Sequence, residues 1–297
     1  MHFVVYLLFT MVIVVFMKNQ IIERFISFES MIIISLTTSP TRINYIKPVI
    51  DSILNQSQRP DMIIINLPKI FKRTGDRFSS IPYFILNQSI IKINWVNDVG
   101  PATKIIPIKD FNFPDDTIII SIDDDIIYSE NFIKEYIKIS LKYPYAVLTG
   151  NSFISATQHQ KLNLSGSDGI THVQLLEGFS GVLYRAKFLK YFNQNDYKLL
   201  HSNLACYLAD DLFLSNYLTK NNIPILLLQN SSISLIPQEF GYQSDALQNG
   251  ADGIVATRFD IQPNDSSFNI TNYRNCIKHL KLTNDYYLDT SNIKFLN

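Results

Sequence analysis

Apolar residues along most of this chain gather in short continuous runs that are separated by turn residues. Runs of strand length span residues 31–37, 62–67, 91–96, 117–122, 146–150 and 223–228. Continuous apolar runs, unlike alternating ones, are typical of strands that are covered on both faces, as in a parallel sheet. The pattern therefore predicts six buried strands in a sheet that is mostly parallel.

Three stretches between these runs have the spacing of helices. Apolar residues recur every three or four positions from residue 46 to 54, and Pro48 lies in the first turn, where its missing N–H costs little. A second helix begins after Ser129, which we expect to cap it, and a third spans residues 210–220. This alternation predicts an α/β fold with a central sheet flanked by helices, and the chain length suits one large domain or two small ones. Residues 151–180 and the tail from residue 229 are expected to be loop-rich.

The N-terminal segment differs from the rest of the chain. Residues 3–17 contain no charge, and Lys18 ends a run whose length is at the lower edge of what crosses a bilayer. We expect a single-pass membrane protein with an uncleaved anchor at residues 1–18, a tether at residues 19–30 and a domain at residues 31–297. A cleaved signal peptide or a buried element are the alternatives, but no basic segment precedes the run and no small-residue cleavage site follows it.

Composition and charge narrow the function classes. Hydrophobic residues make up 46% of the sequence and charged residues 18%, which suits a packed domain. The formal net charge is zero, so no global basic field favours a nucleic-acid partner. Cys206 and Cys276 are too few for a disulfide framework. We expect two buried free thiols, with pairing left open for a lumenal domain.

Three consecutive carboxylates, Asp123, Asp124 and Asp125, follow the apolar run 117–122. They repel one another, and at the mouth of a buried strand they lower stability unless a cation neutralises them. Ligands of open α/β sheets bind at the carboxyl ends of strands, and a divalent ion with oxygen ligands suits this acidic edge. In an extended segment Asp123 and Asp125 would point the same way. The alternative is a solvated acidic turn before the next helix.

Two further candidates are cations in turn-rich segments. In residues 98–104, Gly100 and Pro101 force a tight turn, and Lys104 supplies a point charge suited to a phosphate. Arg42 follows the first predicted strand and could hold a phosphate or a base. Either residue could instead be an ordinary surface cation.

The C-terminal half contributes an acid pair and a glycine-rich segment. Asp210 and Asp211 open the predicted helix 210–220, where one could deprotonate an attacking hydroxyl while the other orients it. Acids also stabilise a helix N-terminus by themselves, which is the structural alternative. In residues 177–184, Gly178 and Gly181 allow the backbone to approach a ligand closely, or mark a bulged strand.

The motifs are more informative in this order along the chain than any one of them is alone. The runs are SLTTSPTR (35–42), DVGPATK (98–104), SIDDDIIYS (121–129), EGFSGVLYR (177–185) and ADDLFLSNYL (209–218). Together they resemble nucleotide-sugar glycosyltransferases with a GT-A fold, in particular family-2-like enzymes. SIDDDIIYS and ADDLFLSNYL are also similar to exostosin-like N-acetylhexosaminyltransferases. The resemblance covers residues 32–228 and implies a single Rossmann-like domain, with a nucleotide-sugar half at about 31–128 and an acceptor half at about 129–297.

The resemblance implies roles for individual residues. The nucleotide-sugar would be bound by Thr37, Arg42, Asp98, Lys104, Asp123 and Asp124. Mn²⁺ or Mg²⁺ would be held by Asp125 and Asp123. Asp211, the second acid of its pair, would be the base, with Asp210 beside it. The acceptor side would be lined by Glu177, Gly178, Ser180 and Gly181. A UDP-sugar donor and a glycan or glycoconjugate acceptor are the expected partners.

Two other functions fit the same motifs. One is a catalytically inactive nucleotide- or sugar-binding relative of the same fold. The other is a metal-dependent phosphohydrolase, a class that usually carries more metal-binding histidines than the five unclustered ones in this chain. His201 or His279 could complete a metal site, although a lone histidine is more often structural.

Overall fold

The computed structural model describes residues 30–155, 158–161, 170–228, 235–237 and 275–281. The expected anchor (residues 1–18) and nearly all of the expected tether (residues 19–30) lie outside this part of the chain. Within the described residues, no helix combines the length and the apolar character that crossing a bilayer requires.

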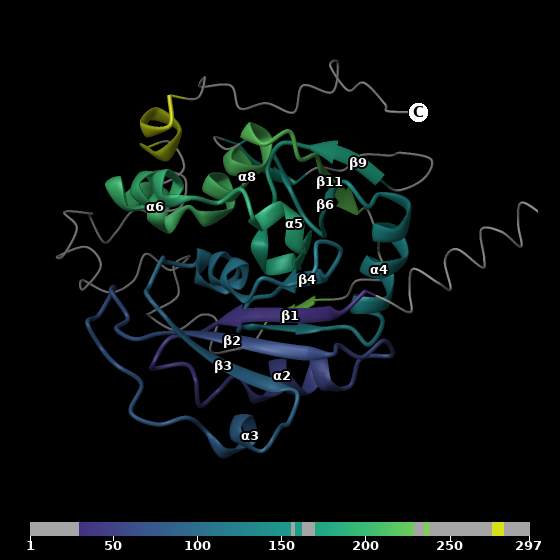
Figure 1. The fold of residues 1–297 in the computed structure, drawn as a ribbon, viewed down its shortest axis with the longest axis vertical. Coiled ribbons are helices and arrows are strands. Elements are labelled where there is room, and N and C mark those ends of the chain that lie inside the picture. The colour runs from purple at the N-terminus through teal and green to yellow at the C-terminus, as the bar shows by residue number, and fades with distance from the viewer. Residues whose placement is uncertain (1–29, 156–157, 162–169, 229–234, 238–274, 282–297) are drawn as a thin grey trace, which may run out of the picture.

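The main sheet of the described residues has eight strands, in the order β3-β2-β1-β4-β10-β6-β11-β9 (Figure 1). In chain order they are β1 (Ile32–Thr37), β2 (Met62–Pro68), β3 (Ile91–Val96), β4 (Ile118–Ser121), β6 (Val147–Thr149), β9 (Ile170–Val173), β10 (Val182–Arg185) and β11 (Ile225–Leu228). β3, β2, β1 and β4 are parallel neighbours, and so are β6 and β11. β10 and β9 are antiparallel to their neighbours, so the sheet is mixed.

Helices and two small sheets complete the described fold. The α-helices are α2 (Lys47–Leu54), α3 (Tyr83–Leu86), α4 (Phe132–Lys142), α5 (Ala186–Leu189), α6 (Gln194–Ser202), α7 (Leu204–Leu208) and α8 (Asp210–Lys220). The 3₁₀ helices are η1 (Ala102–Lys104), η2 (Ile106–Phe111) and η3 (Gly178–Ser180). β5 (Ile126–Tyr128) pairs with β12 (Leu235–Pro237), and β7 (Phe153–Ser155) pairs with β8 (Gln158–Lys161).

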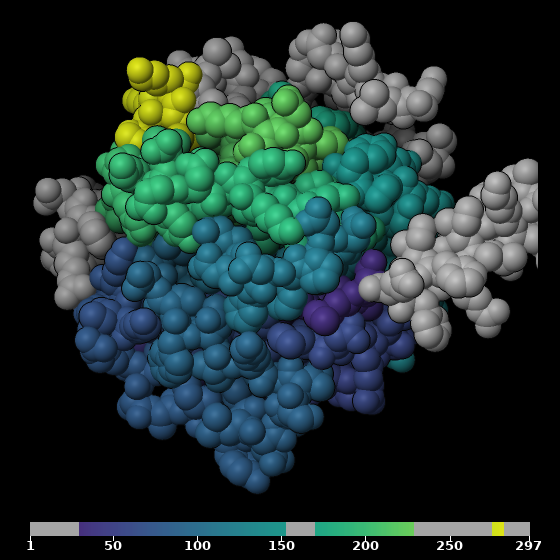
Figure 2. Space-filling model, in the orientation of Figure 1, coloured from purple at the N-terminus to yellow at the C-terminus, as the bar shows by residue number. Residues whose placement is uncertain are grey.

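Apolar side chains of the main sheet are buried on both faces, as their continuous runs predict. In β1, Ile33 joins one core cluster, whereas Ile32 and Ile34 join the other, because successive side chains of a strand point to opposite faces. The cluster around Ile33 includes residues of η2, α5, α7 and α8; the opposite cluster includes residues of α2, α3 and α4. The domain is therefore an α/β fold of three layers. Figure 2 shows the blue N-terminal part and the green α5–α8 part as adjoining surfaces.

The predicted strands and helices occur within a few residues of their expected bounds, and the structure adds elements that were not predicted, among them helices α3, α5, α6 and α7. Ser129 does not cap α4: the N-cap is Asn131, which makes no side-chain capping bond. The segment expected to be loop-rich, residues 151–180, contains β7, β8 and β9. β5 and β10 were not predicted: β5 directly follows the aspartate triplet, and β10 ends in the buried Arg185.

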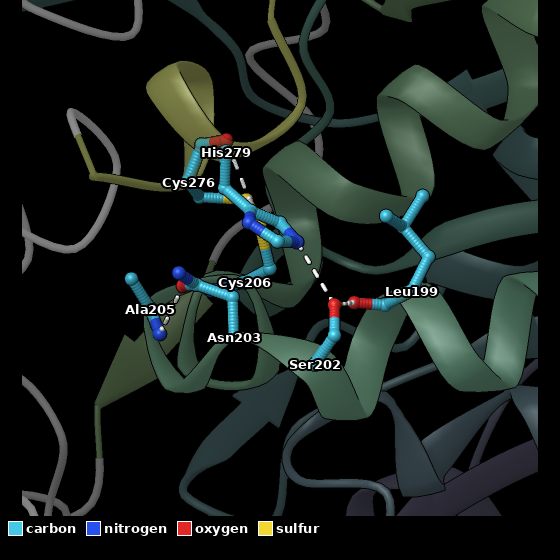
Figure 3. Close-up of a disulfide and its surroundings, with 7 residues drawn as sticks. All are labelled: Leu199, Ser202, Asn203, Ala205, Cys206, Cys276 and His279. Carbon is cyan, nitrogen blue, oxygen red and sulfur yellow. Dashed lines mark hydrogen bonds between the residues drawn. A yellow bond between two sulfur atoms is a disulfide. The ribbon is translucent and has the colours of Figure 1, made fainter.

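The two cysteines form a disulfide, so the expectation of free thiols is wrong. Cys206 in α7 and Cys276 in the helix at residues 275–279 are 70 positions apart in the sequence, and the fold brings them together (Figure 3). Their spacing alone gave no sign of this contact.

Candidate active site

A pocket of about 240 Å³ lies at the edge of the sheet where the parallel strands end. Residues that follow β1, β2, β3 and β4 all line it, because the carboxyl ends of parallel neighbours share one edge. β10 (Val182–Arg185) runs the other way, so Phe179 in η3, three residues before its start, lies at the same edge. The junction of α7 and α8 forms the remaining wall. The lining is Thr37, Thr38, Ser39, Arg42, Pro68, Phe71, Arg73, Asp98, Gly100, Pro101, Lys104, Asp123, Asp124, Asp125, Phe179, Tyr207, Leu208, Asp210 and Asp211.

The aspartate triplet turns directly after β4 and shares one arginine. Asp124 and Asp125 lie in a turn, so the extended geometry that would align Asp123 with Asp125 does not occur. Arg42 Nη2 lies 2.8 Å from Asp124 Oδ1 and 2.9 Å from Asp125 Oδ2. The Thr38 hydroxyl donates to Asp124 Oδ2 at 2.5 Å. The loop after β1 thus neutralises part of the acidic turn after β4.

Lys104 connects the triplet to the acid pair on the opposite wall. Its Nζ lies 2.8 Å from Asp123 Oδ1 and 3.3 Å from Asp210 Oδ2, and the residue is almost fully buried. Burial disfavours the ammonium, but the carboxylates of Asp123, Asp210 and Asp211 outweigh it and raise the Lys104 pKa well above its ordinary value. This lysine is therefore a permanent cation between the two acidic groups.

Crowding of carboxylates raises the pKa of several acids in the pocket. Burial, followed by the charges of Asp124 and Asp123, raises the pKa of Asp125 to about 6, although Arg42 opposes the shift. Burial and the neighbouring Asp210 raise the pKa of Asp211 well above its ordinary value, against the effect of Lys104. Burial likewise raises the pKa of Asp210. Such perturbed carboxyls are typical of functional sites.

The pocket has an excess of negative charge. Six aspartates line it, against the three cationic side chains of Arg42, Arg73 and Lys104. Three negative charges therefore remain when all groups are ionised. Carboxylate oxygens are ligands that Mg²⁺ and Mn²⁺ prefer, so this donor set fits a divalent cation. Among the described residues, however, no three histidine, cysteine or acidic side chains already converge as a metal site.

Neither candidate histidine lines the pocket. His201 lines a separate groove beside β3 and α6, and its ring lies 5.8 Å from that of Tyr207. His279 is bonded to the Ser202 hydroxyl at 2.9 Å. A metal in the pocket would depend on oxygen ligands from the aspartates.

Asp98 and Thr37 line the pocket but bind mainly to the protein itself. Asp98 accepts hydrogen bonds from the backbone N–H groups of Lys72, at 2.7 Å, and Gly100, at 2.8 Å. It thereby fixes the loops after β2 and β3 against each other. The Thr37 hydroxyl donates to the Asn66 carbonyl at 2.7 Å, so it braces β1 against β2.

The glycine-rich segment reaches the pocket only in part. The Gly178 N–H donates to Asp211 Oδ1 at 3.0 Å, and Phe179 lines the pocket. Glu177, Ser180 and Gly181 do not line it. The Ser180 hydroxyl donates to the Glu177 carbonyl, and Gly181, at φ +83°, packs against Phe132. These three residues support the segment from behind.

Gly178 offers a test of how tightly this wall is packed. A Cβ at this position would lie 2.3 Å from Lys104 Nζ and 3.0 Å from Asp211 Oδ1. We expect Gly178→Ala to displace both side chains and to lower any activity of the pocket about tenfold or more, while the fold persists. Activity and thermal unfolding measured on the same preparation check this. Unchanged activity would show that the Lys104–Asp211 spacing is not critical.

Five lining residues lie outside the motifs that the sequence analysis singles out: Pro68, Phe71, Arg73, Tyr207 and Leu208. Phe71 and Arg73 follow β2, and the rule that ligands bind at the carboxyl ends of strands, which pointed to the aspartate triplet after β4, would have found them. No comparable signal existed for Tyr207, because its approach to the loop after β3 depends on how α7 packs.

Comparisons with known proteins add a likeness in fold. No family model matches the chain, and no curated protein matches it. Among solved structures, it is similar to S. aureus TarS 1–349, with TM-score 0.44 and 13% identity over 84% of this chain and 71% of that one. It is also similar to the same protein in complex with UDP-GlcNAc, with TM-score 0.43 and 12% identity over 84% of this chain and 72% of that one. Likeness at this level does not assign the chain to a family or an activity.

Proposed function

We propose that the chain is a glycosyltransferase that moves a sugar from a nucleotide-diphosphate-sugar donor to a hydroxyl acceptor, with a UDP-sugar as the donor. One observation carries the proposal. The pocket places an acidic turn with two buried cations, Arg42 and Lys104, opposite a second acid pair at the start of α8. The two cations can bind a diphosphate, and one acid of the pair can deprotonate a hydroxyl.

The donor diphosphate would bind between the loops after β1 and β4. Arg42 and Lys104 are the pocket cations whose partners are the acidic turn itself. They would stabilise the charge that develops on the leaving nucleoside diphosphate as the bond to the sugar breaks. The nucleoside would lie towards Phe71, Arg73 and Asp98, where an aromatic ring and polar groups follow β2 and β3.

A divalent cation would be held by Asp125 and Asp123, and it would neutralise the diphosphate charge. The three uncompensated negative charges of the pocket lining support Mn²⁺ or Mg²⁺ at this place. The raised pKa of Asp125 supports it too, because that carboxyl lacks sufficient cationic compensation from Arg42 alone.

Asp211 would be the base that accepts the proton of the acceptor hydroxyl. Its Oδ1 is held by the Gly178 N–H, and Asp211 is a partly exposed residue, whereas Asp210 is buried. Asp210 faces Lys104 and would act by holding that cation. The acceptor hydroxyl would approach past Phe179, the residue of the glycine-rich segment that lines the pocket.

A turnover assay tests the proposal. The full chain is incubated with Mn²⁺ and a set of UDP-sugars that includes UDP-GlcNAc, and released UDP is measured with a mixture of glycan acceptors and without it. Acceptor-stimulated release of UDP from one donor is the expected result, and NMR of the product then gives its stereochemistry. UDP binding without release from any donor would support a catalytically inactive relative.

We also propose that residues 1–18 anchor the enzyme to a membrane. The support is the uncharged run at residues 3–17. The full chain should sediment with membranes and resist extraction by carbonate, whereas a chain that begins at Ser30 should stay in the supernatant. N-terminal sequencing of the mature protein is the control. A mature chain that begins beyond Met17 would contradict the anchor and indicate a cleaved signal peptide.

A further inference from the structure

The disulfide between Cys206 and Cys276 lies directly behind one wall of the pocket. Cys206 belongs to α7, and the next two residues, Tyr207 and Leu208, line the pocket. Asp210 follows as the first residue of α8 and also lines it. The cross-link therefore acts on the short helix that carries this wall.

α7 is too short to hold its own position. It has five residues, and isolated helices of this length are not stable in water. Its N-terminus is capped by Asn203, whose side chain accepts from the N–H groups of Ala205 and Cys206. At its other end the Tyr207 carbonyl lies only 2.4 Å from where a Cβ on Gly100 would be. A small displacement of α7 would therefore change the contact with the loop after β3.

The other end of the disulfide is fixed in the core. Cys276 and Ile277 are fully buried members of the core cluster that also contains residues of α7 and α8. A second, non-covalent tie joins the helix at residues 275–279 to α6: the His279 ring is bonded to the Ser202 hydroxyl at 2.9 Å (Figure 3). The helix at residues 275–279 is thus an anchored support for α7.

We propose that the Cys206–Cys276 disulfide positions α7, with Tyr207 and Leu208, so that the nucleotide affinity of the pocket depends on the cross-link. This inference rests on the proposed function for the identity of the ligand, but not for the positioning itself. Reduction by dithiothreitol breaks the S–S bond and yields two thiols, while the reagent is oxidised to its cyclic disulfide. After reduction, α7 is held only by the Asn203 cap and by packing contacts.

Hydrogen exchange on the full chain tests the positioning. After reduction, the backbone amides of residues 204–211 should exchange about tenfold faster or more, while those of β1 and β4 stay as protected as before. In the same samples, the Kd for UDP with Mn²⁺ should rise about tenfold, because α7 no longer holds Tyr207 and Leu208 in place in the pocket wall. The Cys206→Ala/Cys276→Ala variant should show both changes without reductant and should not respond to it.

Ser202→Ala is the matched control, because it removes the His279 hydrogen bond and leaves the disulfide intact. Its exchange at residues 204–211 should stay close to that of the wild type. Unchanged exchange there after reduction would overturn the inference. Equal loss of protection in β1 and β4 would overturn it as well, since the disulfide would then be a general stabiliser. If the oxidised protein does not bind UDP at all, the proposed function fails, and the exchange pattern still decides the positioning.

Discussion

Asp211→Asn should lower turnover by about a hundredfold or more, the usual effect of losing a general base. The substitution keeps the shape of the side chain, and the amide oxygen can still accept from the Gly178 N–H, which now bonds to Asp211 Oδ1. Donor binding should change little, because the lost contact acts mainly in the transition state. Steady-state kinetics with a saturating acceptor would show the change in kcat, and calorimetry with UDP would show the unchanged Kd.

Asp210→Asn is the matched comparison. Consecutive residues of a helix differ in direction by about 100°, so only one acid of the pair can point fully at the reacting atoms. Asp210 is nearly buried and faces Lys104, and so its loss should be milder. An inactive Asp210→Asn with an active Asp211→Asn would assign the base to the first acid. Two active variants would show that the pair only caps α8.

The pH dependence of turnover is a second test of Asp211 as the base. The pKa of Asp211 is raised well above its ordinary value, mainly by burial and by Asp210. A base must be unprotonated to act, so kcat/KM should rise as the pH passes upwards through that raised pKa. The residual activity of Asp211→Asn should lack this rise.

Asp125→Asn should abolish the Mn²⁺-dependent part of nucleotide binding and, with it, turnover. An amide is a weaker ligand for a hard cation than a carboxylate, and it carries no charge to retain the ion. Thermal shift with UDP, measured with Mn²⁺ and with EDTA, should show no difference between the two conditions in this variant. Turnover equal to that of the wild type would contradict the assignment of Asp125 as a metal ligand.

The same substitution should stabilise the ligand-free protein. The pKa of Asp125 is raised from 3.8 to about 6, so the folded chain holds its proton more strongly than the unfolded chain does. Stability therefore falls as pH rises between about 4 and 6, and the full cost, at most about 3 kcal/mol, is present above pH 6. This cost is already net of the favourable contact with Arg42, so Asn should stabilise the ligand-free protein by up to about 3 kcal/mol at pH 7. Asp51→Asn is the control: Asp51 lies on α2 outside the pocket in an exposed ion pair with Lys47, so its loss should lower stability by no more than about 0.5 kcal/mol and leave binding unchanged.

The part of the fold that could be predicted from the sequence is the part with long buried apolar runs. β1, β2 and β4 are covered on both faces, so their residues had to be continuously apolar. β10 was not predicted because it ends in Arg185, whose buried guanidinium donates hydrogen bonds to the carbonyls of Asp116 and Ser140. A charged residue that the backbone satisfies cannot be distinguished from a surface residue by pattern alone.

The candidate site, too, could be predicted in part. The residues after β1, β3 and β4 could be placed together because parallel strands end at one edge, and Arg42, Asp98 and Asp123 all lie there. The bridge that Lys104 makes between Asp123 and Asp210 depends on how α8 packs against η1, which no local pattern encodes. For the same reason, the contact between Cys206 and Cys276 could not be foreseen.

The most direct test of the central claim is calorimetric titration of UDP into the full chain, once with Mn²⁺ and once with EDTA. If the pocket binds a nucleotide-sugar donor through its acidic turn, UDP should bind at one site per chain with Mn²⁺, and the affinity should fall at least about tenfold with EDTA. The absence of UDP binding in both conditions would contradict the donor site, and with it the proposed glycosyltransferase.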